Sequence, residues 1–301
     1  MYRDDMTGLP APDQEIRVVP ANHTMEGMAY MIPDIVFSEA GGKPLKLQLL
    51  RPWPGYTEET RNRKYPLIVF IQGSAFRSPD PCRKIPQLSM FAQAGYVVAS
   101  VTHRSSLEGN PFPAYLQDVK TAVRFLRAHG EEYDIDTARV AAWGSSSGGN
   151  TALLLGFTGD EERYKTDEYR EYSDAVKAVV DCFGPADMSR NRSRILNGEV
   201  FEYSDSLKCL IGEPTERNLE RIKEMDPVRH LKKGKKEPPV LIMHGDQDPV
   251  VPFEQSELLY RSLRETGTET VLVRVEGAPH ERSFWSRQVL DIVREFLDSH
   301  V

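Results

Sequence analysis

The sequence predicts an α/β fold, in which helices cover both faces of a mostly parallel β-sheet. The apolar runs are continuous rather than alternating, as expected of strands buried on both faces, and helical patterns lie between them. The 301 residues suffice for one large domain. The candidate strands are Leu67–Ile71, Tyr96–Val101, Val140–Trp143, Val176–Phe183, Val240–Met243 and Val271–Val275.

Helices are predicted where apolar residues recur every three or four positions and so form one stripe along a helix. Near the N-terminus, Ile35–Phe37 and Leu45–Leu50 flank a turn-rich piece, and we expect them to form an antiparallel hairpin at the sheet edge. The helical stripes are Leu116, Val119, Val123 and Leu126, and, close to the C-terminus, Trp285, Val289, Ile292 and Phe296.

The chain is predicted to be one domain with an insertion. Residues 1–30 are interpreted as an N-terminal extension and residues 31–301 as the domain. From about 185 to 237 the sequence is charged, weakly periodic and without a good strand. A compact domain seldom tolerates such an interruption unless it forms a lid or binding loop, so we expect a cap segment there.

Composition excludes several classes of function. The net charge of −7 argues against a nucleic acid or an anionic membrane as partner. No apolar stretch approaches the ~20 residues of a membrane span, and the acidic, proline-rich N-terminus lacks the features of a signal peptide. The cysteines, Cys82, Cys182 and Cys209, form no metal-binding pattern, so we expect buried, reduced thiols and a cytoplasmic protein.

The segment Gly144-Ser145-Ser146-Ser147-Gly148 matches the pattern G-x-S-x-G, centred on Ser146. A predicted strand precedes it and a helix-forming run follows, which is the context in which such a serine is held on a tight turn. The backbone N–H of Ser147 would then lie at a helix N-terminus, where anions are stabilised. The alternative is that all three serines merely cap the helix.

A serine hydroxyl is a poor nucleophile at neutral pH and needs a base. His280 lies in the loop between the last predicted strand and the last helix, and it is the predicted base. Loops at the carboxyl ends of parallel strands converge on one crevice, so this side chain can meet Ser146. His103, which also follows a strand, is the second choice, and His244 is interpreted as the start of a turn.

The base in turn needs a carboxylate that fixes its tautomer. Asp246 and Asp248 both follow a buried strand, and Asp248 lies further into the loop. Asp248 is therefore the predicted acid, whereas Asp246 is equally suited to forming the turn. The order Ser146, Asp248, His280 is the order of the nucleophile-elbow hydrolases.

An oxyanion hole would complete the site, with one N–H from the residue after the nucleophile and one from the loop after an earlier strand. The first donor would be Ser147. The stretch Gln72–Phe76 contains residues small enough for a carbonyl to approach the backbone. The N–H of Ser74 is the first choice for the second donor and that of Ala75 the alternative, and ordinary turn chemistry also fits this stretch.

Three stretches carry a resemblance: PFPAYLQDVKTAVRFLRAHGEEYDIDTARVAAWGSSSGGNTALLLG, VKAVVDCFGPADM and PPVLIMHGDQDPVVPFEQSELLY. They resemble the α/β-hydrolase fold serine esterases with a carboxylesterase- or lipase-like core, and most of all the feruloyl and acetyl-xylan esterase-like branch, over roughly residues 30–300. The resemblance implies a mostly parallel eight-stranded sheet with one antiparallel strand. It makes Ser146 the nucleophile, Asp248 the acid and His280 the base.

The chain departs from this family's pattern at two places. Members often have H-G-G-G in the oxyanion loop, where this chain reads QGSA at Gln72–Ala75, although the backbone donors survive the change. Members also tend to have glycine on both sides of the histidine, where this chain has Pro279 and Glu281 around His280. Pro279 is expected to stiffen the loop, and the charge of Glu281 either acts on the histidine or points to solvent.

The activity implied by the resemblance is hydrolysis of carboxylic esters of small acyl groups through an acyl-enzyme intermediate. The expected partner is a small-molecule ester, with acetyl or hydroxycinnamoyl esters of plant oligosaccharides as the substrate class; an oligomer is compatible with the sequence. No metal or organic cofactor is expected, because this chemistry needs none. Two alternatives stay open: a prolyl-oligopeptidase-like peptidase, and a non-catalytic hydrolase-fold binding protein.

Two groups of apolar side chains are candidates for the wall of an acyl pocket, with plain packing as the alternative. One group lies in the inserted segment and the other near the N-terminus. They are Phe201, Tyr203 and Leu207, and Met25, Met28, Tyr30 and Met31.

Overall fold

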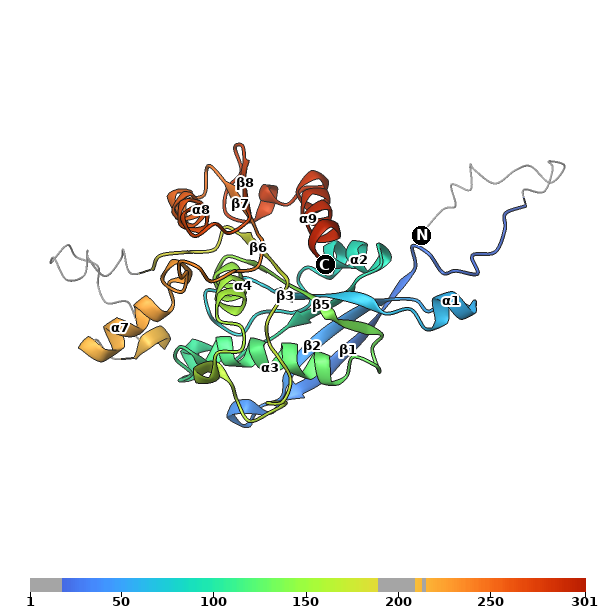
Figure 1. Ribbon diagram of the computed structural model, residues 1–301, viewed down its shortest axis with the longest axis horizontal. Helices are drawn as coiled ribbons and strands as arrows, with labels where there is room; N and C mark the ends of the chain where they lie inside the picture. The colour runs from blue at the N-terminus through green and yellow to red at the C-terminus, as the bar shows by residue number, and fades with distance from the viewer. Residues whose placement is uncertain (1–17, 189–208, 213–214) are drawn as a thin grey trace, which may run out of the picture.

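The computed structural model describes residues 18–188, 209–212 and 215–301, and these form one eight-stranded sheet with helices on both faces (Figure 1). The predicted α/β fold is confirmed. The strands are β1 (Ala29–Ser38), β2 (Leu45–Pro52), β3 (Tyr65–Ile71), β4 (Val97–Val101), β5 (Ile135–Ser145), β6 (Ala178–Cys182), β7 (Val240–Gly245) and β8 (Thr270–Val275). The helices are α1 (Glu58–Arg61), α2 (Ile85–Gln93), α3 (Ala114–Ala128), α4 (Ser147–Phe157), α7 (Glu216–Glu224), α8 (Glu254–Thr266) and α9 (Arg287–His300).

Strand order is β1-β2-β4-β3-β5-β6-β7-β8. β2 pairs antiparallel with both β1 and β4, while the pairs from β4 through to β8 are all parallel. Within the described residues, β2 is therefore the single reversed strand, as the family resemblance implies. The expected hairpin at the sheet edge is the pair β1–β2, with β1 outermost.

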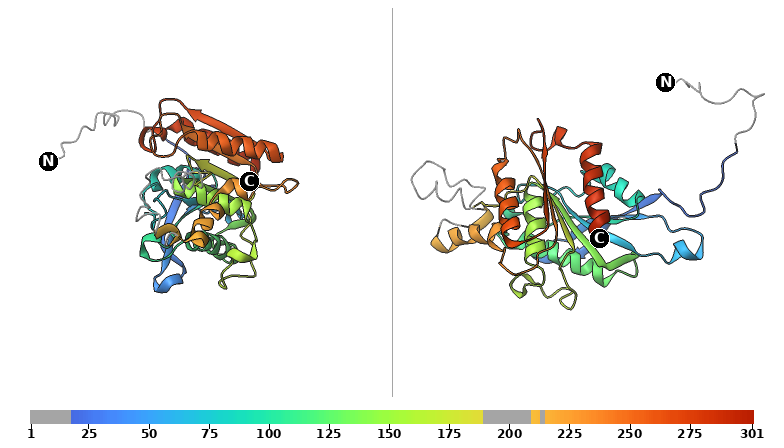
Figure 2. Two further views of the ribbon diagram at one scale, coloured as in Figure 1. Left: turned by 90° about the vertical axis from the view of Figure 1, so that its left-hand side faces the viewer. Right: turned by 45° about the horizontal axis from the view of Figure 1, so that its top comes forward.

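The sheet is buried on both faces, which explains why its strands read as continuous apolar runs. In β3, Leu67, Val69 and Ile71 pack in the core cluster that includes α3, α4 and α8. Ile68 and Phe70 point the other way, into the cluster with α2 and α9. Figure 2 shows the two helical layers on either side of the sheet, with α9 next to α2.

The two predicted helical stripes lie on α3 and α9, with one difference in extent. α9 begins at Arg287, so Trp285 precedes the helix instead of starting its stripe. The reason is the cap: Ser286 has an extended backbone, and its hydroxyl accepts the N–H of Val289 at 3.2 Å.

The inserted segment is only partly described, because residues 189–208 and 213–214 lie outside the described ranges. The described remainder contains α7 and a single 3-10 turn, η4 (Pro227–Arg229). Ile211, Ile222 and Met225 are buried and belong to the core cluster shared with α3 and α4. The second half of the insertion thus packs on the main core, and the interpretation of residues 185–237 as a cap stays a prediction.

The cysteines differ in exposure from what the sequence led us to expect. All three are free thiols; Cys182 is buried and Cys209 half-buried, but Cys82 is exposed. The expectation of buried thiols is wrong for Cys82, because it lies in the turn before α2 and not on a core-facing strand. Within residues 18–188, 209–212 and 215–301, no helix is both long and apolar enough to cross a membrane.

Candidate active site

Ser146 lies on a sharp turn between β5 and α4. Its backbone (φ 55°, ψ −125°) is in a region that side chains rarely adopt, and its N–H donates to the carbonyl of Cys182 at 2.9 Å. A Cβ atom at Gly144 would overlap the backbone of Gly148, and one at Gly148 would overlap the carbonyl of Ile71. The two glycines of the G-x-S-x-G pattern therefore let strand, turn and helix pack closely enough to hold Ser146 in this conformation.

The three residues predicted to work together meet at the edge of the sheet where the parallel strands end. The Oγ atom of Ser146 lies 3.0 Å from Nε2 of His280, and Nδ1 of His280 lies 2.6 Å from Oδ2 of Asp248. A carboxylate only accepts, so Nδ1 carries the proton and Nε2 is left to accept from the serine hydroxyl. The Asp248 side chain is fully buried and that of His280 is 14% exposed.

Asp248 is held by donors on both oxygens. The backbone N–H groups of Val250 and Val251 donate to Oδ1 at 2.7 and 2.9 Å. Oδ2 faces two histidines, with His280 at 2.6 Å and Nε2 of His244 at 3.2 Å. These bonds orient the carboxylate toward His280 and satisfy a buried charge.

His244 is a residue of this site that sequence reasoning missed. It is fully buried, and its Nε2 faces two acceptors, Oδ2 of Asp248 and the carbonyl of Val251 at 2.9 Å. Nε2 must therefore carry the proton, and Nδ1 accepts the hydroxyl of Ser256 at 2.6 Å. Burial lowers the pKa of His244, which favours this neutral form. The sequence signal that could have identified His244 is its position directly after a predicted buried strand, four residues before Asp248.

An aromatic side chain supports the imidazole of His280. The buried ring of Phe183 packs edge-on against it, with ring centroids 4.7 Å apart and planes at 62°. Phe183 in turn packs against Phe284 at 4.6 Å. This apolar contact limits the orientations of the ring and keeps water from one side of it.

The loop after β3, predicted to supply an oxyanion donor, lies directly against the serine turn. Gly73 N–H donates to Oγ of Ser145 at 3.2 Å, and Ser74 N–H donates to Oγ of Ser147 at 2.9 Å. A Cβ atom at Gly73 would lie 2.7 Å from the Ser145 carbonyl oxygen and 2.8 Å from Cβ of Ser146. Ser145 and Ser147 thus hold the loop through their hydroxyls. The alternative interpretation, in which the three serines merely cap the helix, does not account for these contacts.

This contact bears on the choice of oxyanion donor. The N–H of Ser74, our first choice, is engaged with the hydroxyl of Ser147. Ala75 follows with a left-handed backbone, φ 53°, and Ser147 is the first residue of α4, where the N–H groups have no intrahelical acceptor. Which loop N–H serves stays a prediction.

His103, the second choice for the base, and Asp246, the other aspartate after β7, make different contacts. His103 is buried, and its Nδ1 lies 2.8 Å from the carbonyl of Arg104; burial lowers its pKa. Asp246 accepts the N–H of Gly277 at 2.7 Å, which is the turn-forming role that the sequence also allowed.

The apolar residues near the N-terminus lie at the end of the sheet where the parallel strands begin, opposite the end that carries Ser146. Tyr30 pairs with Arg51 near the end of β2, and the neighbouring Leu50 pairs with Val98 near the start of β4. Because β2 is antiparallel, its end coincides with the start of the parallel strands. The candidate pocket wall of Met25, Met28, Tyr30 and Met31 is therefore wrong, and the other candidates, Phe201, Tyr203 and Leu207, lie outside the described residues.

Glu281 points into the protein, so of the two alternatives left open for its charge, the one in which it points to solvent is wrong. Its Oε2 accepts from Nζ of Lys84 at 2.9 Å and from Nε1 of Trp285 at 2.6 Å. Its Oε1 accepts from Oγ of Ser145 at 3.2 Å. Burial alone would raise the pKa of Glu281, but the hydrogen bond and charge of Lys84, with the donors Trp285 and Ser145, lower it below its usual value.

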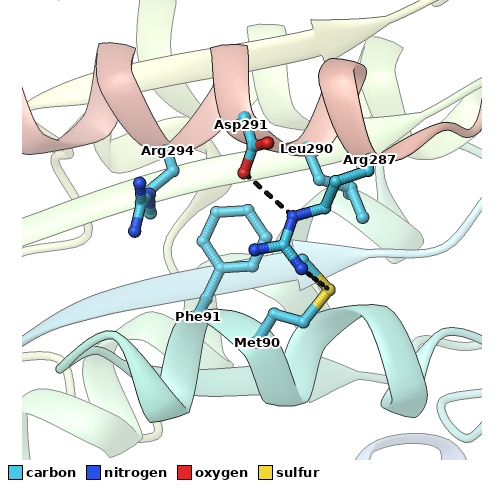
Figure 3. A pocket seen from close by; sticks show the side chains of 6 residues that line it. All are labelled: Met90, Phe91, Arg287, Leu290, Asp291 and Arg294. Carbon is cyan, nitrogen blue, oxygen red and sulfur yellow. Dashed lines mark hydrogen bonds and ion pairs between the residues drawn. The ribbon is translucent and has the colours of Figure 1, made fainter. Parts of the chain in front are cut away.

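A small hollow between α2 and α9 is unrelated to this site. Figure 3 shows the Arg287 guanidinium beside Asp291 of the same helix, at 3.1 Å, and beside the sulfur of Met90 on α2, at 3.8 Å. The hollow measures about 20 Å³, room for about one water molecule and not for an ester. Among the described residues, no group of three or more His, Cys, Asp or Glu side chains is arranged to hold a metal ion.

Comparison with known proteins finds several esterases among the proteins similar to this chain. Residues 56–263 match the BD-FAE family. Esterase LipC of Mycobacterium tuberculosis (strain ATCC 25618 / H37Rv) is 29% identical over 237 residues, which cover 77% of this chain and 56% of LipC. The chain spans about half the length of the curated relatives it matches.

Solved structures agree over nearly the whole chain. A truncated carbohydrate esterase from gut microbiota superposes with a TM-score of 0.72 and 26% identity, covering 93% of this chain and 98% of the esterase. The esterase Est2 of Thermogutta terrifontis, solved with propionate bound, gives a TM-score of 0.71 and 26% identity over 91% and 95% of the two chains. With a family match over more than half of its length, and with this sheet order and serine turn, the chain belongs to the BD-FAE family and has the α/β-hydrolase fold of these esterases.

Proposed function

We propose that this protein is a carboxylic ester hydrolase in which Ser146 is the nucleophile, His280 the base and Asp248 the carboxylate that orients the base. The observation that carries the proposal is the continuous hydrogen-bonded chain from Ser146 Oγ through His280 to Asp248, at 3.0 and 2.6 Å. The esterase relatives support the same reaction class.

In the proposed reaction each proton has a route. Ser146 Oγ attacks the ester carbonyl carbon while Nε2 of His280 takes the hydroxyl proton. Asp248 keeps the Nδ1 proton in place and stabilises the imidazolium that forms. The C–O bond to the alcohol then breaks and His280 returns its proton to the leaving alcohol. Water then attacks the acyl carbon while Nε2 of His280 takes a proton from it. The C–O bond to Ser146 breaks, His280 returns that proton to Ser146 Oγ, and the carboxylic acid leaves.

The negative charge on the carbonyl oxygen develops next to the N-terminus of α4. We propose that the N–H of Ser147 donates to it, together with that of Ala75 or Ser74 from the loop after β3. Supporting this, both segments lie against Ser146. Removing one such donor typically costs about 3 kcal/mol of transition-state stabilisation.

For the substrate, we propose small acyl esters, with acetyl or hydroxycinnamoyl groups on plant saccharides as the class to test first. The support is the match to the BD-FAE family and the similarity to a carbohydrate esterase and to an esterase that bound propionate. A single domain with a cap at residues 185–237 and a cytoplasmic location belong to the same proposal.

A fluorophosphonate probe tests the nucleophile. The folded wild-type protein should be labelled on one serine, which peptide mass spectrometry should identify as Ser146, and Ser146→Ala should abolish labelling. In p-nitrophenyl acetate hydrolysis, Ser146→Ala and His280→Ala should each lower kcat by at least about 10³-fold. A folded wild type that neither reacts nor hydrolyses esters would favour a binding protein, and preference for a proline-containing peptide anilide would favour a peptidase.

The substrate class needs a second comparison. Hydrolysis of an acetylated and of a feruloylated xylo-oligosaccharide should be compared with hydrolysis of p-nitrophenyl esters of increasing acyl length. Turnover of one of the two oligosaccharides at a kcat/KM above that for p-nitrophenyl acetate is the expected result. If both oligosaccharides resist hydrolysis while the p-nitrophenyl esters are cleaved, the saccharide proposal is wrong and the esterase proposal stands.

A further inference from the structure

The residue after His280 has an unusual backbone for its type. Glu281 has φ 63° and ψ −155°, a region that is nearly restricted to glycine. The next residue, Arg282, is also left-handed, at φ 53°. A residue with a long side chain persists in such a conformation only where its surroundings hold it there, so the contacts of the Glu281 carboxylate need an explanation.

All four partners of that carboxylate are donors. Oε2 accepts from Lys84 and Trp285, at 2.9 and 2.6 Å. Oε1 accepts from the hydroxyl of Ser145 at 3.2 Å and, more weakly, from Nε2 of Gln72 at 3.4 Å. The side chain is 15% exposed, and that of Lys84 is 12% exposed. A nearly buried carboxylate with a matched cation and a full set of donors is a specific arrangement and not an incidental surface pair.

Ser145 connects this carboxylate to the oxyanion loop. Its hydroxyl donates its proton to Glu281, so its lone pairs are directed to the N–H of Gly73 at 3.2 Å. Gln72 also spans the two groups, since its Nε2 lies 3.3 Å from the carbonyl of Gly73. Glu281 thus fixes which way the Ser145 hydroxyl points, and that hydroxyl holds the loop next to Ser146.

The other oxygen connects the carboxylate to two helices. Lys84 is the residue that precedes α2, and its ammonium lies 4.4 Å from the centre of the Trp285 ring. Trp285 in turn lies just before α9, which packs against α2 in the same core cluster. The side chain of Glu281 therefore joins the base-bearing loop, the end of β5 and the two helices beneath them.

We propose that Glu281 is a positioning residue: with Lys84 as its counter-ion, it holds the oxyanion loop at its working distance from Ser146 and His280. The inference rests on the proposed ester hydrolase function. The carboxylate of Glu281 hydrogen-bonds to Gln72, Lys84, Ser145 and Trp285 and not to Ser146 or His280, so it takes no part in proton transfer. It acts through Ser145 and Gly73, on the donors that meet the developing negative charge.

Glu281→Gln is the main test. All four partners are donors, so an amide satisfies one pair and presents its own NH₂ donor to the other. We expect kcat for p-nitrophenyl acetate to fall about tenfold or more, part of the loss for a whole oxyanion donor. KM should stay within about twofold of the wild type, because the loop donors bind the negative charge that is present only in the transition state. Inhibition by a phenylboronic acid, which forms a tetrahedral adduct with a serine, should weaken by a similar factor.

Two further variants separate this role from a structural one. Ser145→Ala breaks the same connection at its other end, so the double variant should be no slower than the slower single variant. Lys84→Met removes the counter-ion and supplies a second variant should Glu281→Gln fail to fold. Glu237→Gln is the matched control. The Glu237 side chain is 1% exposed, pairs with Lys235 at 3.1 Å and lies just before the start of β7, whereas Ser146 lies where the parallel strands end. This variant should leave kcat unchanged.

The proposal is overturned if Glu281→Gln and Lys84→Met keep kcat within about twofold of the wild type. It is also overturned if the Glu281 and Ser145 effects multiply in the double variant, because two independent roles would then be at work. A wild type that hydrolyses no ester would refute the proposed function instead, and that result comes from the wild type alone.

Discussion

Gly73→Ala tests the contact between the oxyanion loop and the serine turn by adding one methyl group. Gly73 has no left-handed backbone, so alanine is compatible with its conformation and the effect is purely steric. The new Cβ would lie 2.7 Å from the carbonyl oxygen of Ser145, about 0.7 Å short of the 3.4 Å at which ordinary contact begins. It would also lie 2.8 Å from Cβ of Ser146. The obstructing atoms lie on or next to the main chain, so the loop itself has to move.

The expected magnitude follows from that displacement. A misplacement of about 1 Å can cost about 10²-fold in rate. A shift of about 0.7 Å in the donors should therefore lower kcat about 30- to 100-fold, or about 2–3 kcal/mol in the activation free energy. KM should change less than about threefold, because the donors bind the transition state more strongly than the ester.

The assay is steady-state hydrolysis of p-nitrophenyl acetate, together with the rate of fluorophosphonate labelling and a thermal melt. Gly156→Ala is the control, because its Cβ would lie 2.5 Å from Cγ2 of Val179, within the core and near the end of α4. The control should lower the melting temperature and leave kcat intact. If Gly73→Ala is folded and keeps kcat within about threefold of the wild type, the loop does not supply a donor.

Two predictions concern buried charges. Burial raises the pKa of Asp181 to about 7 in the folded protein. At pH values between the pKa of the unfolded chain and about 7, only the folded protein keeps this proton. The free energy of unfolding therefore falls as the pH rises through this range. Asp181→Asn keeps an oxygen for the N–H of Gly184. Its stability relative to the wild type should be greater at pH 8 than at pH 5, by up to about 3 kcal/mol, because two pH units separate pH 5 from the folded pKa of about 7. Equal melting-temperature differences at both pH values would contradict this. Asp174 is fully buried between Lys120 and Arg124, at 2.7 and 3.0 Å. Asp174→Asn should lower the free energy of unfolding by about 3–5 kcal/mol and leave kcat unchanged. Denaturant unfolding and ester hydrolysis kinetics measure the two quantities.

Local patterns were enough for the fold and for the order of the candidate residues. The run Val240–Met243 is strand β7 because its side chains are apolar on both faces, and that property is visible in the sequence. Gly144 and Gly148 likewise predicted the sharp turn at Ser146, because residues without Cβ are required at those two positions. The start of α9 was misplaced, since the cap formed by Ser286 depends on one hydrogen bond that apolar periodicity does not report.

What the sequence by itself determined is the set of short-range facts: which runs are strands, where the serine turn lies, and that an acid and a base follow later strands. The tertiary structure alone decided what those groups contact. His244 is a second donor to Asp248, and Glu281 points inward to Lys84. The residues near Tyr30 lie where the parallel strands begin, at the opposite end from Ser146. The physical reason is that burial and hydrogen-bond partners depend on segments far apart in the chain, brought together only when the strands pair.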